Sequence, residues 1–213
     1  MPRIDAVAFD FNGTLSDDEA LLCAIYRELF AEHGRPLEED EYYASLAGRS
    51  EEAIVGGWLG VAGPVLDALV AERVARYRQR AADGSTIRAA TRAAVRHAGA
   101  RVPVAVVSGA FRDEIEPVLA AAGLDDVFAT LVTADDVAYG KPHPECYETL
   151  ARRLRVAPGA VVAFEDTEAG VAAAVAAGCR CVALRGTVAP ERLARAEELV
   201  DRIDVALVAR LLG

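Results

Sequence analysis

Acidic, hydroxyl and basic side chains stand at the ends of several apolar runs in this chain, where they could share one site. Asp10 ends the first run, Ser108 ends a second, and the pair Glu165 and Asp166 ends a third. The carboxyl ends of parallel strands meet at one edge of an open α/β sheet, and such sheets bind ligands there. A carboxylate at that edge can act as a nucleophile, and two adjacent acids offer the oxygen ligands that Mg²⁺ prefers.

The use of lysine singles out a further residue. The chain has 23 basic residues, and Lys141 is the only lysine among them. It lies in the segment Gly-Lys-Pro-His-Pro, a loop that two prolines restrain before a predicted helix. An ammonium group held in such a loop can neutralise a carboxylate or a phosphoryl group. We therefore place Lys141 among the candidate catalytic residues.

Apolar periodicity predicts two kinds of structure along the chain. Residues 17–82 contain only helical patterns, separated by glycine and proline breaks. From Ile87 onward helices and strands alternate, which is typical of a parallel sheet with crossover helices. We predict an α/β fold with a Rossmann-like parallel-sheet core, residues 1–15 and 84–213, and an inserted α-helical cap, residues 16–83. The tail, residues 190–212, is expected to form two helices around a short strand.

The order of these segments resembles the motifs of the haloacid dehalogenase (HAD) superfamily, in its phosphoglycolate phosphatase and β-phosphoglucomutase branch. The segments are Asp-Phe-Asn-Gly-Thr-Leu from Asp10, Val-Val-Ser-Gly up to Gly109, Gly-Lys-Pro around Lys141, and Phe-Glu-Asp-Thr-Glu-Ala-Gly around Asp166. The resemblance covers nearly the whole chain. It implies a magnesium-dependent hydrolase whose five-stranded parallel sheet has the first strand beside the strand that ends in the acidic pair.

The resemblance also implies a role for each motif. Asp10 would attack phosphorus and form an aspartyl-phosphate, while Lys141 would neutralise the transferring group. Mg²⁺ would take oxygens from Asp10, the backbone carbonyl of Asn12 and Asp166, with Glu165 bound directly or through water. The candidate residues for binding the phosphate are Ser108, Gly109, Ala110, Arg112, Lys141 and, in the cap, Arg49.

Asn12 departs from the motif, because most members of the superfamily have a second aspartate there. That aspartate protonates the departing oxygen and then activates water, and a neutral carboxamide cannot exchange protons in this way. General acid–base help is worth on the order of 10² to 10⁴ in rate. A phosphatase with Asn12 would act on good leaving groups or recruit help from the cap, where Glu19, Arg49 and Glu51 are the candidates.

Other functions in the superfamily stay open or fail on the residues present. A 2-haloacid dehalogenase needs the aspartate and the lysine, but that branch generally lacks the acidic pair; an impaired protein could still bind a phosphorylated ligand. A phosphonoacetaldehyde hydrolase needs a cap lysine, and residues 1–140 contain none. Mutase activity is disfavoured because Leu22 and Glu51 stand where that branch usually has histidine and arginine. Asn12 could also be a substitution made to trap a substrate, or could deamidate at its bond to Gly13.

Composition limits the partners. A net charge of −10 argues against nucleic-acid binding, which needs clustered basic residues. The apolar runs fall short of the roughly 20 residues of a membrane helix, and the N-terminus lacks the pattern of a secretory signal. We therefore expect a cytoplasmic protein that takes a small phosphorylated metabolite and contacts no membrane. The four cysteines lack a metal-ligand spacing and are expected to be reduced core thiols. These patterns do not specify the oligomeric state.

Overall fold

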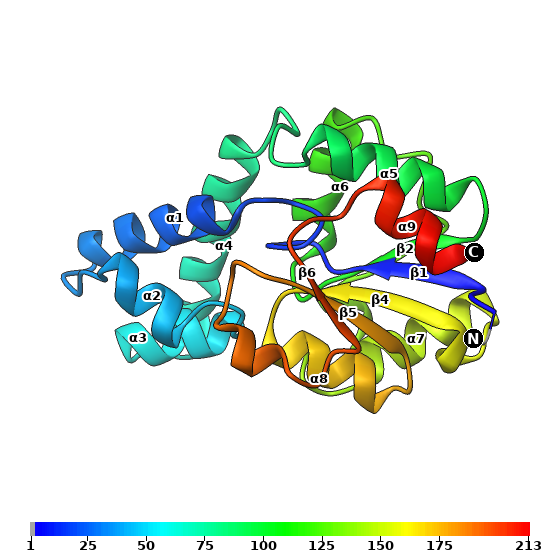
Figure 1. Ribbon diagram of the computed structural model, residues 1–213. Coiled ribbons are helices and arrows are strands. Elements are labelled where there is room, and N and C mark those ends of the chain that lie inside the picture. The colour runs from blue at the N-terminus through cyan, green and yellow to red at the C-terminus, as the bar shows by residue number, and fades with distance from the viewer. Residues whose placement is uncertain (1–2) are drawn as a thin grey trace.

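A parallel sheet with helices on both faces forms the larger part of the protein, and further helices lie beyond the carboxyl ends of its strands (Figure 1). The computed structural model describes residues 3–213, so the first two residues of the predicted core lie outside the described residues. Within that range the sheet has six strands in the order β3-β2-β1-β4-β5-β6. They are β1 Ala6–Phe9, β2 Val104–Val107, β3 Thr130–Val132, β4 Val161–Glu165, β5 Arg180–Leu184 and β6 Glu198–Val200.

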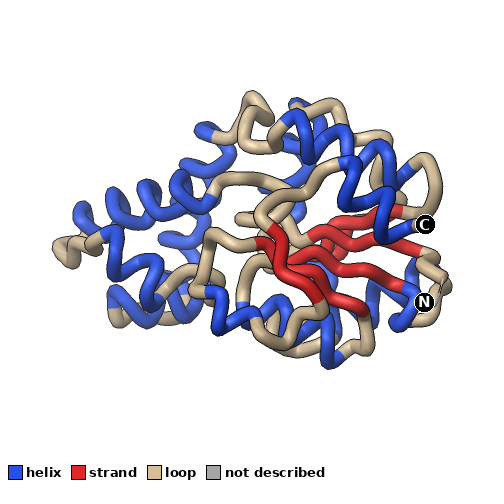
Figure 2. The backbone as a smooth tube through the Cα atoms, viewed as in Figure 1, coloured by secondary structure: helices blue, strands red, loops and turns tan. Residues whose placement is uncertain are grey.

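The helices fall into two groups (Figure 2). Those inserted after β1 are α1 Glu19–Glu32, α2 Glu39–Ser45, the π-helix η1 Glu52–Gly56, α3 Gly57–Leu59 and α4 Pro64–Arg80. Those around the sheet are α5 Ala89–Gly99, α6 Arg112–Ala121, α7 Glu145–Leu154, α8 Glu168–Ala176 and α9 Val205–Leu212, with the 3₁₀ turns η2 Ala134–Asp136, η3 Pro158–Ala160 and η4 Pro190–Leu193. The predicted α/β fold class is confirmed.

The sheet has one strand more than the five that the resemblance implies. The additional strand is β6, which pairs in parallel with β5 and brings Leu199 opposite Ala183. Backbone bonds from Arg185 N to Val200 O (3.0 Å) and from Glu197 N to Cys181 O (2.7 Å) continue this pairing. The tail thus covers the edge of β5, whose backbone groups would otherwise remain unpaired. Its first predicted helix is only the short 3₁₀ turn η4.

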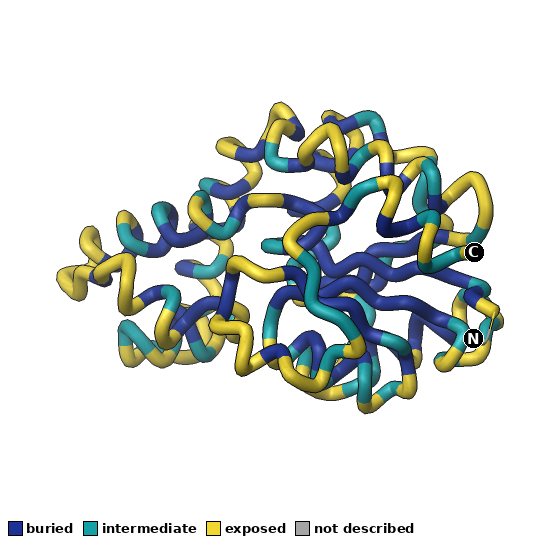
Figure 3. Tube along the Cα trace, in the orientation of Figure 1, coloured by how far each residue is buried: buried dark blue, intermediate teal, exposed yellow. Residues whose placement is uncertain are grey.

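Side chains alternate between the two faces of the central strands, as the strand period of two requires. Val7 and Phe9 of β1 pack under α5, α6 and α9, while Ala6 and Ala8 pack against α7 and α8. The rings of Phe9 and Phe164 stack with centroids 5.1 Å apart, which joins β1 to β4 on one face. Figure 3 shows this centre as the most deeply buried part of the chain. The strands that carry the motifs are therefore the most firmly packed.

The inserted helices share an apolar cluster with one face of the sheet. Phe30 and Tyr77 belong to the same buried cluster as Phe9 and Phe164. These helices lie within the predicted cap, residues 16–83, and the division of the chain into a core and a mobile cap stays a prediction. The four cysteines are free and buried, as expected.

No single helix in residues 3–213 is long and apolar enough to cross a membrane. One pair, Glu52–Leu59 with Pro64–Arg80, meets the criteria of length and composition only when taken together, and a bend of 120° separates its two parts. The apolar residues Ile54, Val55 and Leu69 of this pair are buried in the core of the protein itself.

Candidate active site

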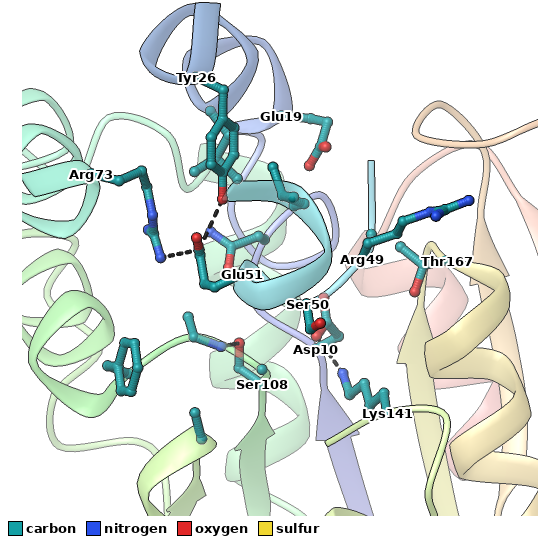
Figure 4. Close-up of a pocket in the computed structure, with 18 of the residues that line it drawn as sticks. Asp10, Glu19, Tyr26, Arg49, Ser50, Glu51, Arg73, Ser108, Lys141 and Thr167 are labelled. Atoms are coloured by element: carbon teal, nitrogen blue, oxygen red, sulfur yellow. Dashed lines mark hydrogen bonds and ion pairs between the residues drawn. The ribbon is translucent and has the colours of Figure 1, made fainter. Parts of the chain in front are cut away.

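Lys141 forms ion pairs with two carboxylates at the carboxyl ends of β1 and β4. Its Nζ lies 2.5 Å from Asp10 Oδ1 and 2.7 Å from Glu165 Oε1, and it donates to the carbonyl of Val107 at 3.0 Å. Figure 4 shows the bond to Asp10 at the base of a cavity. Burial alone would lower the pKa of Lys141, but the charges of Asp10 and Glu165 raise it well above its ordinary value. The lysine is therefore an ammonium ion at neutral pH.

Asp166 completes a buried acidic cluster with the first two acids. One oxygen from each of Asp10, Glu165 and Asp166 lies within 4.8 Å of the other two. Burial and then the charges of Asp10 and Glu165 raise the pKa of Asp166 well above its ordinary value. One lysine cannot balance three carboxylates, so the cluster as it stands favours binding of a further cation.

Hydroxyl groups hold the two acids that follow β4. Asp166 accepts hydrogen bonds from Thr14 Oγ1 at 3.0 Å and from Thr187 Oγ1 at 2.5 Å. Glu165 Oε1 accepts from the Tyr147 hydroxyl at 2.5 Å, while its Oε2 is buried without a hydrogen-bond partner. Sequence reasoning missed all three hydroxyl residues. Two of them carry a signal that could have revealed them, since Thr14 lies inside the first motif and Thr187 follows β5 at the same edge of the sheet.

Two glycines of the motifs lie so close to these acids that a residue with a side chain would not fit. A Cβ on Gly13, whose φ is +74°, would lie 2.0 Å from Asp166 Oδ2. A Cβ on Gly170 would lie 1.8 Å from Glu165 Oε2. Any side chain at either position would push a carboxylate out of place, so both glycines serve the acidic cluster.

The loop after β2 presents polar groups to the same cavity. Ser108 is buried, and its Oγ accepts a hydrogen bond from the Ala110 N–H at 3.1 Å. Ser108, Gly109 and Ala110 line a cavity of about 330 Å³ together with the other predicted residues Asp10, Asn12 and Lys141. The structure thus brings these six predicted residues to one place, where a hydroxyl and backbone groups face a carboxylate and an ammonium ion.

The two predicted arginines are placed differently. Arg112 does not line this cavity, because its Nη2 is bound to Asp136 Oδ2 at 2.8 Å and to the carbonyl of Leu131 at 3.2 Å. The prediction that Arg112 binds phosphate is therefore not supported by its position. Arg49 lines the cavity, but it is exposed and its guanidinium points away from Asp10 (Figure 4).

Asn12 is hydrogen-bonded to an acid that the sequence did not single out. Its Nδ2 donates to Asp18 Oδ2 at 2.9 Å, and Asp18 also accepts from Gly13 N at 3.1 Å and from the hydroxyl of Tyr77. Burial raises the pKa of Asp18 to about 6, although these hydrogen bonds oppose the shift. Asp18 precedes α1 and Tyr77 lies in α4, so the motif loop is joined to the inserted helices.

The wall of the cavity opposite Asp10 comes from the inserted helices. Glu19 accepts a hydrogen bond from the Tyr42 hydroxyl at 2.8 Å, and burial raises the pKa of Glu19 to about 7, with the charges of Asp18 and Asp10 adding to this shift. Glu51 accepts from the Tyr26 hydroxyl at 2.8 Å and forms an ion pair with Arg73 (Figure 4).

Arg73 also forms an ion pair with Glu114 of α6. The side chains of Arg73 and Glu114 are only 4% and 1% exposed, so this pair joins α4 to the core away from water.

Comparisons with known proteins agree with this arrangement. Residues 4–178 match the model of a hydrolase family described as haloacid dehalogenase-like hydrolase. The validoxylamine A 7'-phosphate phosphatase of Streptomyces hygroscopicus subsp. limoneus is 37% identical over 195 residues, which are 90% of this chain and 91% of that protein. A phosphorylated carbohydrates phosphatase of Thermotoga maritima is 31% identical and covers 82% of each chain.

The fold has a close match among solved structures. A mutant of CbbY from Rhodobacter sphaeroides, in complex with xylulose-(1,5)bisphosphate, superposes with a TM-score of 0.84 at 28% identity, over 94% of this chain and 95% of that one. The present chain therefore belongs to the haloacid dehalogenase-like hydrolase family, as the motifs predicted. It is a hydrolase, and its relatives support a phosphatase that acts on phosphorylated substrates.

Proposed function

We propose that the protein is a magnesium-dependent phosphatase in which Asp10 attacks the phosphorus of a small phosphorylated metabolite. The observation that carries this proposal is the contact of Asp10 Oδ1 with Lys141 Nζ at 2.5 Å, beside Ser108 and at the base of the cavity. The ammonium ion holds one carboxylate oxygen and leaves the other for attack. The backbone and hydroxyl groups of the loop after β2 would receive the phosphoryl oxygens.

The acidic cluster fits a magnesium ion. Three buried carboxylates with one lysine carry excess negative charge, and oxygen donors are the ligands of Mg²⁺. Asp10, the carbonyl of Asn12 and Asp166 would hold it. Glu165 would bind it directly or through water, since Lys141 and Tyr147 share its Oε1 while its Oε2 has no hydrogen-bond partner. A bound Mg²⁺ would supply charge stabilisation to the transferring group.

Magnesium is expected to raise both turnover and thermal stability. At a concentration 100 times its Kd, binding to the folded state alone adds about 2.7 kcal/mol. The melting temperature and the initial rate would be measured in EDTA and after addition of Mg²⁺. Asp166→Asn should lose most of both effects, whereas Asp201→Asn, at an exposed ion pair with Arg185, should keep them. Turnover that persists unchanged in EDTA would contradict the metal assignment.

Among the residues of the inserted helices, Glu19 is best placed to replace the missing proton carrier. It lines the cavity with Asp10 and Asn12, and its pKa of about 7 lets it both give and take a proton at neutral pH. Glu51 is less suited because Arg73 holds it as an ion pair. Arg49 points away from Asp10.

Glu19 would give up a proton in the first step of the reaction and regain it in the second. First an Asp10 oxygen bonds to phosphorus, the bond from phosphorus to the leaving oxygen breaks with its electron pair, and that oxygen takes a proton from Glu19. Then a water oxygen bonds to phosphorus, the bond to Asp10 breaks, and a proton of the water returns to Glu19. Lys141 stays charged throughout and remains paired with Asp10 before the attack.

Turnover of two kinds of phosphate ester is expected to depend on pH in opposite directions. An alkyl phosphate needs protonated Glu19 for departure of its alkoxide, so its turnover should fall as pH rises through about 7. For p-nitrophenyl phosphate the leaving group needs no proton, so we expect the second step to limit the rate. That step needs ionised Glu19, so turnover should fall as pH drops through about 7.

The matched variants are Glu19→Gln and Glu32→Gln, the latter at an exposed position of the same helix. Glu19→Gln should lower the turnover of alkyl esters by a factor on the order of 10² or more, and it should abolish both pH dependences. Glu32→Gln should leave the turnover and both pH dependences unchanged. Profiles of kcat that are the same in all three proteins would exclude Glu19 as the carrier.

The polar wall favours a hydroxyl-rich monophosphate, such as a sugar phosphate. Glu51 Oε2 is buried without a hydrogen-bond partner and can accept from a ligand hydroxyl, and Glu19 offers a second acceptor. Arg73 is already paired with Glu51 and Glu114, so it is not free to bind a second anionic group. Arg49, the other arginine of this wall, points away from Asp10 (Figure 4). The relatives named for validoxylamine A 7'-phosphate and for phosphorylated carbohydrates agree with this class.

A panel of hexose monophosphates, a sugar bisphosphate, phosphoglycolate and 2-haloacids tests the assignment. The hexose monophosphates should have the highest kcat/KM. A preference for phosphoglycolate or for the bisphosphate would overturn the substrate class. Release of halide without magnesium would instead identify a dehalogenase, a function that the cluster of Asp10, Glu165 and Asp166 disfavours.

A further inference from the structure

Asp18 stands where an aspartate commonly caps a helix, yet it does not cap α1. An aspartate in this position usually accepts hydrogen bonds from the first N–H groups of the helix, and the side chain of Asp18 accepts none of them. Its carboxylate accepts instead from the Asn12 amide, the Gly13 N–H and the Tyr77 hydroxyl. The residue is fully buried. Its carboxylate therefore serves the motif loop and not the helix that it precedes.

The hydrogen bond fixes the orientation of the Asn12 side chain. An ionised carboxylate can only accept, so Asn12 must present its Nδ2 to Asp18. The amide carbonyl is then the end left for the cavity, which Asn12 lines beside Asp10. A fixed carbonyl oxygen there can accept a hydrogen bond from an attacking water, although it cannot take the proton.

We propose that Asn12 and Asp18 form a matched amide–carboxylate pair, in which Asp18 is the positioning residue that holds the Asn12 carbonyl toward the reaction site. A carboxylate would then work at position 12 only if residue 18 is not also a carboxylate. The inference rests on the proposed phosphatase function, and it makes Asn12 a working part of the site and not simply a lost acid.

The donors and acceptors explain why the two positions must change together. In Asn12→Asp alone, two carboxylates would face each other at the 2.9 Å of the present bond, and they could stay so close only by sharing a proton, which removes one of their two charges. In the double swap, Asn12→Asp with Asp18→Asn, the new amide at position 18 donates to the new carboxylate. Tyr77 keeps a partner in that variant, because its hydroxyl can accept as well as donate.

The experiment is a cycle of four proteins: wild type, Asn12→Asp, Asp18→Asn and the double swap. Each is assayed with Mg²⁺ on p-nitrophenyl phosphate and on glucose 6-phosphate, and its unfolding in urea is recorded. Both single variants should lose about tenfold or more in kcat/KM on both esters. The double swap should recover, and its turnover of glucose 6-phosphate relative to p-nitrophenyl phosphate should rise by on the order of 10². Asp17→Asn, at an exposed neighbouring position, should match wild type.

The readout on two esters separates positioning from mere packing. If the double swap recovers stability without turnover, the pair is only structural and the proposal fails. If Asn12→Asp alone gains as much activity on glucose 6-phosphate as the double swap does, no pairing is needed and the proposal also fails. If Asn12→Asp does not fold, the comparison of Asp18→Asn with the double swap still decides, since recovery in the swap supports the pair and no recovery overturns it.

A failure of the proposed function gives a different result. In that case wild type turns over neither ester, and the urea data alone decide the pairing. Losses of stability in the single variants that vanish in the double swap support the pair, whereas additive losses overturn it.

Discussion

Replacement of Asp10 by alanine is expected to reduce kcat on p-nitrophenyl phosphate by on the order of 10⁴-fold or more, because no other described carboxylate shares its place between Lys141 and the loop after β2. Wild type quenched in acid during turnover should carry the mass of one added phosphoryl group, and peptide mapping should place it on Asp10. The variant should carry none.

Two comparisons make this prediction specific. Asp17→Ala removes an acid of the same segment that forms only an exposed ion pair with Arg88, and it should retain wild-type turnover. Asp10→Asn keeps the size of the side chain but removes its charge, and it should be as inactive as Asp10→Ala. Turnover of Asp10→Ala within about tenfold of wild type would exclude Asp10 as the nucleophile.

Replacement of Lys141 by methionine is expected to lower both activity and stability. The ammonium ion is the charge that Asp10 and Glu165 share, and losing one such group typically costs on the order of 10² to 10³ in kcat. Leaving its buried partners without a counter-charge should cost about 3 kcal/mol of unfolding free energy at pH 7 without magnesium. Initial rates and urea unfolding measure the two effects.

The loss of stability should depend on pH in a defined direction. The pKa of Lys141 is raised in the folded protein, so its contribution is fully present below the ordinary lysine pKa, including the whole range from pH 4.5 to 7. In the variant the buried acids hold protons more tightly when folded, so stability falls as pH rises through that range. The deficit relative to wild type should therefore be larger at pH 7 than at pH 4.5. Arg88→Met, at an exposed ion pair, should show no such trend.

The sequence predicted the core of the fold because its signals are local. Continuous apolar runs in segments such as Val104–Val107 and Val161–Glu165 indicate strands buried on both faces. A short strand was also predicted in the tail, where Glu198–Val200 lies, but its pairing with β5 was not, because it depends on how the tail returns to the sheet. The sequence also predicted that the motifs lie close together, because each follows a strand and the carboxyl ends of parallel strands meet at one edge of the sheet.

The contacts of the candidate site were only partly predictable. The predicted residues at the ends of β1 and β2 line the cavity, but Arg112 does not. Its position near the start of a helix does not reveal that Asp136 binds its guanidinium. Tyr147 reaches Glu165 from α7, and Tyr77 reaches Asp18 from α4. Such contacts join residues far apart in the chain and leave no local pattern, so only the folded structure reveals them.

The ion pair between Arg73 and Glu114 has a consequence for how fast a ligand can enter. It spans α4 of the insertion and α6 of the core, and both side chains are almost shielded from water. Any movement that widens the entrance by separating α4 from α6 must hydrate two charges before a new partner is found, which raises a barrier on the path inward. Association of a ligand should then be slower than diffusion and steeply dependent on temperature. Arg73 itself lines the cavity, so the same side chain that faces a ligand also joins the insertion to the core.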